Sequence, residues 1–331
     1  MSVSPQKSSI TLLTPDKKES NNHPRILLKN TRLPLNKNPT ILGLTFDPHL
    51  TFAQHTQNLI SKATHKLNAL KTLTDITFGQ HKETLVIVYK QFIRSLLNYA
   101  SPAWAPILSQ TNLQKLETIQ NSALRVITGC LPTTPIPHLQ SETKILPLKD
   151  HLDMIGTQFY SRTISTDHPL HYTLQLAPPP PRNNKNTPAK YYSDIYNSIP
   201  PPPPNTSPIK HIHTQLTHRS LESRPPNPIL GTIAPQISSS EQTLDRKTRV
   251  TVARLRSEYY HPSLQKYRNK VNLAPHPFCL RCQDSSVDDT KHLLLDCQAF
   301  LDARLSNPLS LLDLWLQPAA VARFLDEARF S

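Results

Sequence analysis

Three of the four cysteines lie close together near the C-terminus, with a histidine among them. Cys279, Cys282, His292 and Cys297 form a C-x2-C-x9-H-x4-C pattern. Two thiolates from a CxxC turn, joined by a histidine and a third thiolate, make a tetrahedral set of the kind that binds zinc. Because all four ligands are side chains and none is water, we expect a structural ion. The alternative is ordinary buried cysteines, the interpretation that we favour for Cys130.

No group of residues has the types and spacing that a catalytic site requires. Nucleotidyl transfer by two metal ions requires convergent carboxylates. The only adjacent aspartates, Asp288 and Asp289, lie inside the spacer of the cysteine cluster, and we interpret them as solvated loop charges. The five glycines are far apart, which excludes a Walker loop, a dinucleotide fingerprint and a GxSxG elbow.

The positive charge favours a polyanionic partner. There are 37 Lys and Arg against 23 Asp and Glu, a net charge of +14. Lys62 and Lys66 are one helical turn apart, as are Lys90 and Arg94, and such rows can follow a phosphate backbone. The alternative is a set of solvated helix faces. The basic residues that we expect to contact nucleic acid are Lys62, Lys66, Lys71, Lys90, Arg94, Arg125, Arg254 and Arg256.

The elements that position these residues are mainly helical. Residues 1–50 alternate as short strands, of which Ile41–Phe46 is the clearest. Residues 51–175 carry three amphipathic runs, which predict a helical bundle. The runs extend from Phe52 to Leu73, from Leu85 to Tyr99 and from Leu113 to Ile127. For the third run, Thr111 and Gln114 fit a capping box, and Gly129 fits the C′ position.

Residues 176–241 are rich in proline and polar residues. Pro178–Pro181 and Pro200–Pro204 favour polyproline II, so we expect a disordered linker. The more specific alternative is that this segment binds an SH3 or WW domain. Residues 242–331 then predict a basic helix, the zinc site and a final helix from Leu309 to Phe330. The sequence has no apolar signal segment and no long apolar span, so we expect a nuclear or cytoplasmic protein rather than a secreted or membrane protein.

Several segments resemble the C-terminal part of a jockey-like non-LTR retrotransposon reverse transcriptase. KSSITLLTP at residues 7–15 is similar to the "KS.VTLFTP" stretch after the palm motif, and ILGLTFDPHLTF at 41–52 is similar to "YLGVTFD..LTF". Residues 92–106 resemble "LIRS.L.YA.P.W.P", and residues 113–130 resemble "L.KL..IQN.ALR..TG". The tail resembles "LR…C..C…HLLL.C", with Arg254-Leu-Arg256 followed by the cysteines and HLLLDC.

The resemblance implies a palm end at 1–50, a thumb at 51–175 and a zinc-bearing tail. In this family the "LG" strand contributes to the primer grip, which implies a role for Gly43, where backbone could approach a primer. The implied partners are a template–primer duplex and the retroelement RNA. The catalytic "F/YxDD" motif belongs upstream, so we expect the isolated chain to be inactive, with magnesium bound only by the parent polymerase.

Two other interpretations stay open at this stage. One is a basic helical scaffold for nucleic acid or protein, which would dock a partner through residues 178–208. The other is a decayed gene product without a role. An upstream palm segment supplied separately is also compatible with the resemblance.

Overall fold

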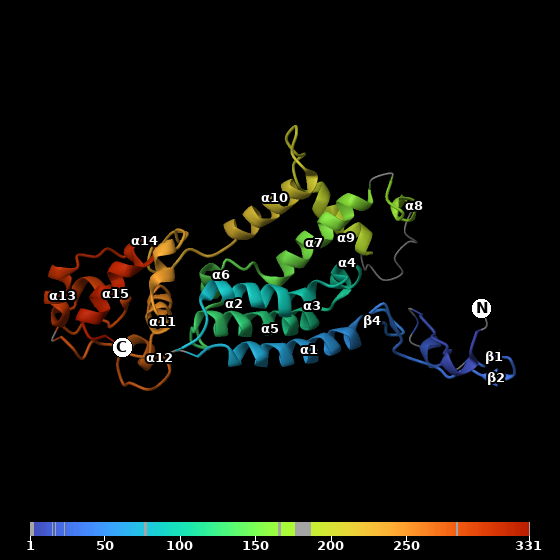
Figure 1. Cartoon of the computed structure of the whole chain (residues 1–331), viewed down its shortest axis with the longest axis horizontal. Helices are drawn as coiled ribbons and strands as arrows, with labels where there is room; N and C mark the ends of the chain where they lie inside the picture. The colour runs from blue at the N-terminus through green and yellow to red at the C-terminus, as the bar shows by residue number, and fades with distance from the viewer. Residues whose placement is uncertain are drawn as a thin grey trace. The chain divides into compact units, whose positions relative to one another are not determined.

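The computed structural model describes residues 3–14, 16, 18–22, 24–75, 78–164, 167–175, 187–282 and 284–330 (Figure 1). This part of the chain is mainly helical, with two small antiparallel sheets, which confirms the predicted fold class. None of its helices is both long and apolar enough to cross a membrane. The chain forms two compact units. Unit 1 is Met1–His65, Arg94–Ile119 and Pro147–Arg219; unit 2 is Lys66–Ile93, Gln120–Leu146 and Ser220–Ser331.

The N-terminal strands form two hairpins in unit 1. β1 (Leu27–Leu28) pairs with β2 (Thr31–Arg32), and β3 (Thr40–Ile41) pairs with β4 (Leu44–Thr45). The prediction of one strand over Ile41–Phe46 is therefore wrong. Leu42 and Gly43 have φ values of 48° and 81°, and two consecutive positive φ values reverse the chain in a tight hairpin turn. Short 3₁₀ turns precede the sheets at η1 (Pro5–Lys7) and η2 (Glu19–Asn21).

Helix α1 (Ala53–Thr72) forms where the first helical run was predicted. Asp47 fixes the turn before its start, because the Asp47 carboxylate accepts from the backbone N–H of Thr51 at 3.0 Å and of Phe52 at 2.6 Å. The core of unit 1 lies beneath this helix. It consists of Leu44, Phe52, Leu59, Leu97, Trp104, Leu116, Leu148 and Leu152.

The second run forms a helix with a π-helical centre. It comprises α2 (Lys82–Val88), η3 (Tyr89–Arg94) and α3 (Ser95–Asn98). It ends at Asn98, and Ala100, with φ 49°, precedes α4 (Ser101–Trp104). Pro102 lies in the first turn of α4, which η4 (Ala105–Ile107) extends. The third run forms α5 (Gln110–Thr128).

The ends of α5 test two local predictions. Ser109, rather than Thr111, caps the helix, because its hydroxyl accepts from the N–H of Asn112 at 3.3 Å. Gly129 has φ 69° and its N–H bonds to the Arg125 carbonyl at 2.9 Å, which confirms its role at the C-terminus. A Cβ at Gly129 would lie 2.5 Å from a methyl of Val250, so close packing also requires a glycine here.

Helices α6 (Ile136–Thr143), α7 (Leu148–Thr163) and α8 (His171–Gln175) follow. Where a disordered linker was expected, the structure has α9 (Pro188–Asn197) and α10 (Pro208–Glu222). Each begins with a proline, which is compatible with the first helical turn. Each also buries an apolar face, which a proline count does not reveal: Tyr192 packs on Gly156 of α7, and Ile212 and Leu216 pack on Met154. Pro178–Pro181 lie outside the described residues.

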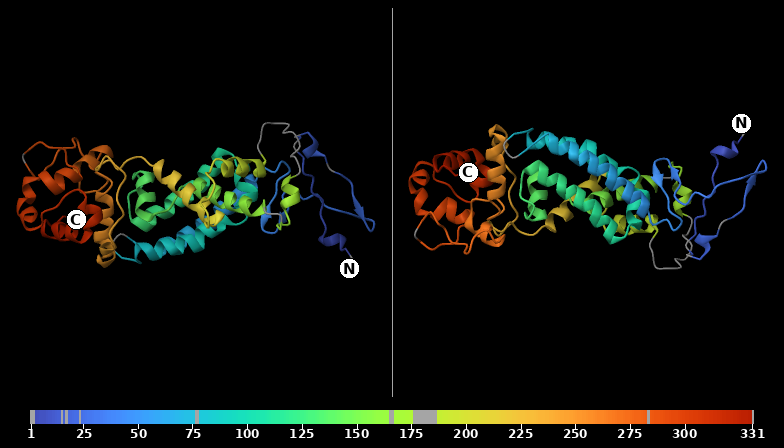
Figure 2. Two further views of the ribbon diagram at one scale, coloured as in Figure 1. Left: turned by 90° about the horizontal axis from the view of Figure 1, so that it is seen from above. Right: turned by 90° about the horizontal axis from the view of Figure 1, so that it is seen from below.

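The C-terminal part of unit 2 is a group of short helices around one core. The views in Figure 2 show α11 (Arg246–Leu255) beside this group. The other helices are η5 (Ser239–Thr243), α12 (Gln265–Lys270), η6 (His292–Asp296), η7 (Gln298–Phe300), α13 (Leu301–Ser306), α14 (Asp313–Leu316) and α15 (Pro318–Glu327). The expected single helix over Leu309–Phe330 is thus two, because Pro318 has no N–H for a continuing helix and instead begins α15.

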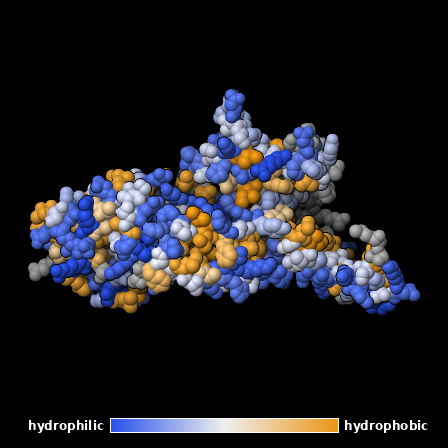
Figure 3. All heavy atoms as spheres, in the orientation of Figure 1, coloured by the Kyte–Doolittle hydropathy of each residue, from blue (hydrophilic) through white to orange (hydrophobic). Residues whose placement is uncertain are grey.

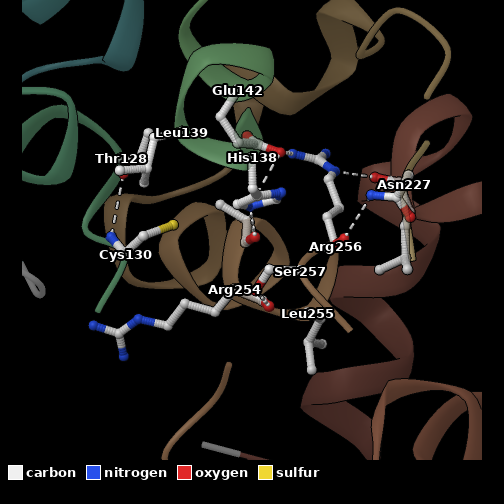
Figure 4. A network of polar contacts seen from close by, with 12 residues as sticks. Thr128, Cys130, His138, Leu139, Glu142, Asn227, Arg254, Leu255, Arg256 and Ser257 are labelled. Atoms are coloured by element: carbon white, nitrogen blue, oxygen red, sulfur yellow. Dashed lines mark hydrogen bonds and ion pairs between the residues drawn. The ribbon is translucent and has the colours of Figure 1, made fainter. Parts of the chain in front are cut away.

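A buried ionic cluster joins four segments of unit 2. Arg256 is fully buried, and its Nη1 donates to Glu142 Oε2 at 3.1 Å (Figure 4). The same Nη1 donates to Glu241 Oε1 at 2.6 Å. Lys82 pairs with both carboxylates. Burial alone would raise the pKa of Glu142, but the charges of Arg256 and Lys82 outweigh it and lower that pKa to about 2.

Replacing Arg256 with methionine should strongly destabilise the chain. The variant leaves Glu142 and Glu241 buried with Lys82 as their remaining cation, and breaking a buried ion pair from one side costs about 3–5 kcal/mol. Arg268→Met is the matched control, because Arg268 is exposed, and it should cost less than about 0.5 kcal/mol. Urea unfolding at equilibrium measures both. Equal losses in the two variants would contradict the role of the cluster.

The same cluster predicts a pH dependence. The pKa of Glu142 is lower in the folded chain than its ordinary value of 4.5, so its contribution to stability is complete above that pH. The contribution should disappear as the pH falls from 4.5 towards 2. Arg256→Met should reduce this acid-dependent component in the same unfolding measurements.

Candidate metal centre and basic surface

The structure brings the four predicted ligands together. One ligand atom from each of Cys279, Cys282, His292 and Cys297 can be chosen so that all lie within 4.8 Å of one another. The sulfurs of Cys279 and Cys297 are 3.9 Å apart, and Cys282 Sγ is 3.3 Å from His292 Nε2. Tetrahedral zinc would hold two sulfurs about 3.8 Å apart, and a sulfur and a nitrogen about 3.6 Å apart. The side chains present therefore fit a zinc ion.

Backbone pairing holds the CxxC turn in place. Phe278 pairs with Val287 across an antiparallel bridge, and Cys279 N donates to the Ser286 carbonyl at 2.9 Å. Arg281 N donates to Cys279 Sγ at 3.4 Å, which closes the turn. The other two ligands lie at the ends of η6: His292 begins it and Cys297 follows it, with the N–H of Cys297 bonded to the carbonyl of His292 at 2.8 Å.

The interpretation of Asp288 and Asp289 as solvated charges is wrong. Asp288 is fully buried, forms an ion pair with Arg281 and accepts from Gln265 N at 2.8 Å. Asp289 accepts from His292 N at 3.1 Å and pairs with Lys266 at 3.3 Å. These carboxylates position the metal loop, residues 278–289, against α12. Sequence gives no signal for this role, because the partners come from other elements.

Arg281, between the two cysteines of the CxxC turn, points into the core. Its guanidinium lies 5.5 Å from the ring centroid of Phe300 and 5.6 Å from that of Phe330. It also donates to the Ser263 carbonyl at 3.3 Å. The metal loop is therefore anchored to the helical core of unit 2 by a partly buried cation close to two aromatic rings.

The surroundings of Cys297 disfavour ionisation of its thiol. Burial, followed by the neighbouring Cys279 and Cys282, raises the pKa of Cys297 to about 12. A bound zinc ion would replace the thiol protons and compensate the negative charge. Cys130 lies outside the cluster and is buried, as predicted for a small core residue, and burial raises its pKa to about 12.

Helix α1 carries the clearest exposed basic side chains. Its sequence has three lysines and no acidic residue. Lys62 is exposed, and Lys66, one turn later, is half-buried with its ammonium 4.1 Å from the Phe92 ring centroid. Lys71 is exposed but follows Lys62 by roughly 2.5 turns, so the two point to opposite sides of the helix. Lys62 and Lys66 thus form one row, and Lys71 lies outside it.

The second predicted pair does not form an exposed row. Lys90 is exposed, whereas Arg94 is 6% exposed. Burial raises the pKa of Glu117, and the nearby charge of Arg94 offsets only part of that rise. Arg125 is half-buried on α5.

Arg254 and Arg256 have structural partners. Arg254 donates through Nε and Nη2 to the Gly129 carbonyl at 3.0 and 2.8 Å. Arg256 occupies the buried ionic cluster, where it pairs with Glu142 (Figure 4). Neither guanidinium faces solvent, so we leave both out of the candidate nucleic-acid surface. Their spacing on a helix does not distinguish a buried arginine from an exposed one.

Gly43 lies at the exposed tip of the β3–β4 hairpin. A Cβ at this position would lie 3.2 Å from Tyr99 Cε1, and Tyr99 Oη donates to the Leu42 carbonyl at 2.8 Å. Leu42 is 86% exposed. The tyrosine at the end of α3 therefore supports a hairpin tip whose backbone and one apolar side chain face outward.

One basic segment was missed from sequence. Between Tyr259 and Cys282 the chain has four basic residues and no acidic residue. Two of the basic residues, Lys266 and Arg281, are paired with carboxylates, but Arg268 and Lys270 are exposed on α12. Phe278 on the metal loop is 43% exposed, with the His276 ring stacked on it at a centroid distance of 5.6 Å. Interleaved aromatic and basic residues were the signal that could have identified it.

These features define a mainly helical, basic protein with a closed Cys₃His centre. Among curated proteins, the chain is similar to the "Probable RNA-directed DNA polymerase from transposon X-element" of Drosophila melanogaster, with 21% identity over 139 residues. The match spans 42% of this chain and 15% of that protein. No protein-family model matches the chain, and no solved structure matches it. The similarity supports an origin related to reverse transcriptases.

The metal centre predicts a zinc content of about one ion per chain, measured by elemental analysis of the purified protein. Cys297→Ser removes a ligand and should abolish most of the binding. Cys130→Ser is the matched control, because it removes a buried cysteine outside the cluster and should keep the metal. Undiminished zinc in Cys297→Ser would rule out the assigned ligand set.

Proposed function

We propose that this chain is part of a retroelement reverse transcriptase and binds the template–primer duplex without itself joining nucleotides. The observation that carries the proposal is the similarity of 139 residues to a transposon-encoded RNA-directed DNA polymerase. The net charge of +14 supports a polyanionic partner.

Duplex binding would use the lysine row of α1. Lys62 and Lys66 are one turn apart on a helix without acidic residues, so no carboxylate of α1 repels a phosphate or competes for the ammonium groups. Lysines of this kind bind phosphates without reading base sequence, as a polymerase that copies any template requires.

The β3–β4 hairpin would contact the primer strand. By its resemblance to the primer grip, the turn at Leu42 and Gly43 would approach the primer backbone, and Tyr99 would keep the turn in place. A side chain at position 43 would meet the Tyr99 ring, so a glycine allows both the turn and the tyrosine.

The zinc-bearing tail would add contacts to unpaired RNA. Arg268 and Lys270 would bind phosphates, and Phe278 would stack on a base. The metal has a structural role in this arrangement, because its four ligand positions are filled by side chains and it holds the Phe278 loop in place.

Nucleic-acid binding by the lysine row predicts a steep dependence on salt. The logarithm of the association constant for an RNA–DNA duplex should fall linearly with the logarithm of salt concentration, and Lys62→Gln and Lys66→Gln should each reduce the slope by about 1. Lys71→Gln, on the opposite side of α1, is the matched control and should leave the slope unchanged. Fluorescence anisotropy measures each constant. A flat salt response would overturn the proposed duplex binding.

The purified chain should extend no primer on an RNA template, because the catalytic motif expected from the resemblance is not in its sequence. A primer-extension assay with magnesium tests this, with an intact reverse transcriptase as the positive control. Incorporation of nucleotides by the chain would refute the inactive assignment.

A further inference from the structure

The connection between α9 and α10 contains five consecutive prolines. All residues from Pro200 to Pro208 are exposed. Figure 1 shows this connection as a yellow loop that projects from the ends of the two helices, and the space-filling view in Figure 3 shows the same projection. The prolines therefore present their rings to solvent within a part of the chain that is otherwise packed.

The loop is not needed to span a distance. His211 Nε2 in the first turn of α10 lies 2.7 Å from the Pro200 carbonyl, so the chain returns close to the point where it leaves. Arg219 donates to the Ser198 hydroxyl and carbonyl at 3.2 Å each, and Ile199 packs on the cluster of Met154, Ile212 and Leu216. A turn of a few residues would connect these helices. A simple spacer is thus a poor explanation for the proline run.

The run is also conformationally restricted. Each proline fixes its own φ near −65°, and consecutive prolines favour polyproline II, which rises about 3.1 Å per residue. Five such residues extend about 15 Å. The run ends in a turn, where Thr206 N donates to the Pro203 carbonyl at 3.1 Å and Asn205 has φ 64°. Both ends are held, so little conformational entropy remains to be lost on binding.

We propose that Pro200–Pro204 is a docking site for a partner domain with an aromatic-lined groove that binds polyproline II. Such grooves bind the preformed proline helix between aromatic rings. The run has no N–H donors of its own, but its carbonyls can accept hydrogen bonds from a groove. Between Asp194 and Glu222 the sequence has basic residues and no acidic ones, so a groove with an acidic rim would fit best.

A small pocket beside the run supports this assignment. Tyr196, Ile199, Pro201 and His211 are among the residues that line it. An aromatic side chain at the edge of the partner groove could enter the pocket while the prolines occupy the groove. This docking site is independent of nucleic-acid binding, because none of its residues belongs to the lysine row or the metal centre.

The test titrates the full chain against three purified probes, an SH3, a WW and an EVH1 domain, by isothermal calorimetry. At least one domain should bind, and replacing Pro201–Pro204 with Gly-Ser-Gly-Ser should weaken that binding at least about tenfold. The matched control replaces Pro178–Pro181 with Gly-Ser-Gly-Ser, and this variant should bind as tightly as the unchanged chain. Circular dichroism establishes that each variant keeps its helices.

A peptide covering residues 199–208 provides a measurement that does not depend on folding of the variant. It should displace the full chain from the domain that binds. The proposal is overturned if none of the three domains binds, or if the control replacement, rather than that of Pro201–Pro204, removes binding. Duplex affinity should be equal in all variants, so this outcome is separate from the outcome for nucleic-acid binding.

Discussion

The buried pairing of Arg256 with Glu142 and Glu241 determines how unit 2 is assembled. These charges come from α6, η5 and the end of α11, and Lys82 adds a fourth from α2. Taking an unpaired arginine out of water would be prohibitively unfavourable, so these segments must meet for any of them to be buried. Arg256 also donates to the Leu314 carbonyl at 2.7 Å, which extends the constraint to α14. One guanidinium thereby sets the arrangement of elements that are distant in sequence.

The same contacts change the interpretation of the charge. Four arginines hold unit 2 together by bonding to backbone carbonyls or buried carboxylates: Arg246, Arg254, Arg256 and Arg281. The cations that face solvent are mainly lysines, such as Lys62 and Lys270. This division follows from chemistry, because a planar guanidinium can satisfy several acceptors at once in a buried site, whereas an ammonium is more strongly hydrated. A net charge therefore indicates a polyanionic partner more reliably than it indicates which side chains bind it.

The sequence predicted those features that depend on residues near one another in the chain. The three long helices follow from apolar spacing, and the metal ligands follow from the interval between thiols. Features that depend on distant partners were not predictable. The turn at Leu42 and Gly43 is supported by Tyr99, Asp288 is buried by Arg281, and α9 is stabilised by the fit of Tyr192 against Gly156. Proline content likewise indicated a linker because it says nothing about the apolar faces of α9 and α10.

The position of Arg281 between Phe300 and Phe330 couples the metal loop to the last residues of the chain. Opening of the loop would withdraw the cation from both rings and from Asp288, which leaves a fully buried carboxylate without its counter-charge. Loop and C-terminal helices should consequently lose their order in a single cooperative step. Proteases that cleave only disordered chain would then reach the C-terminal segment at the moment when the loop opens, and not before.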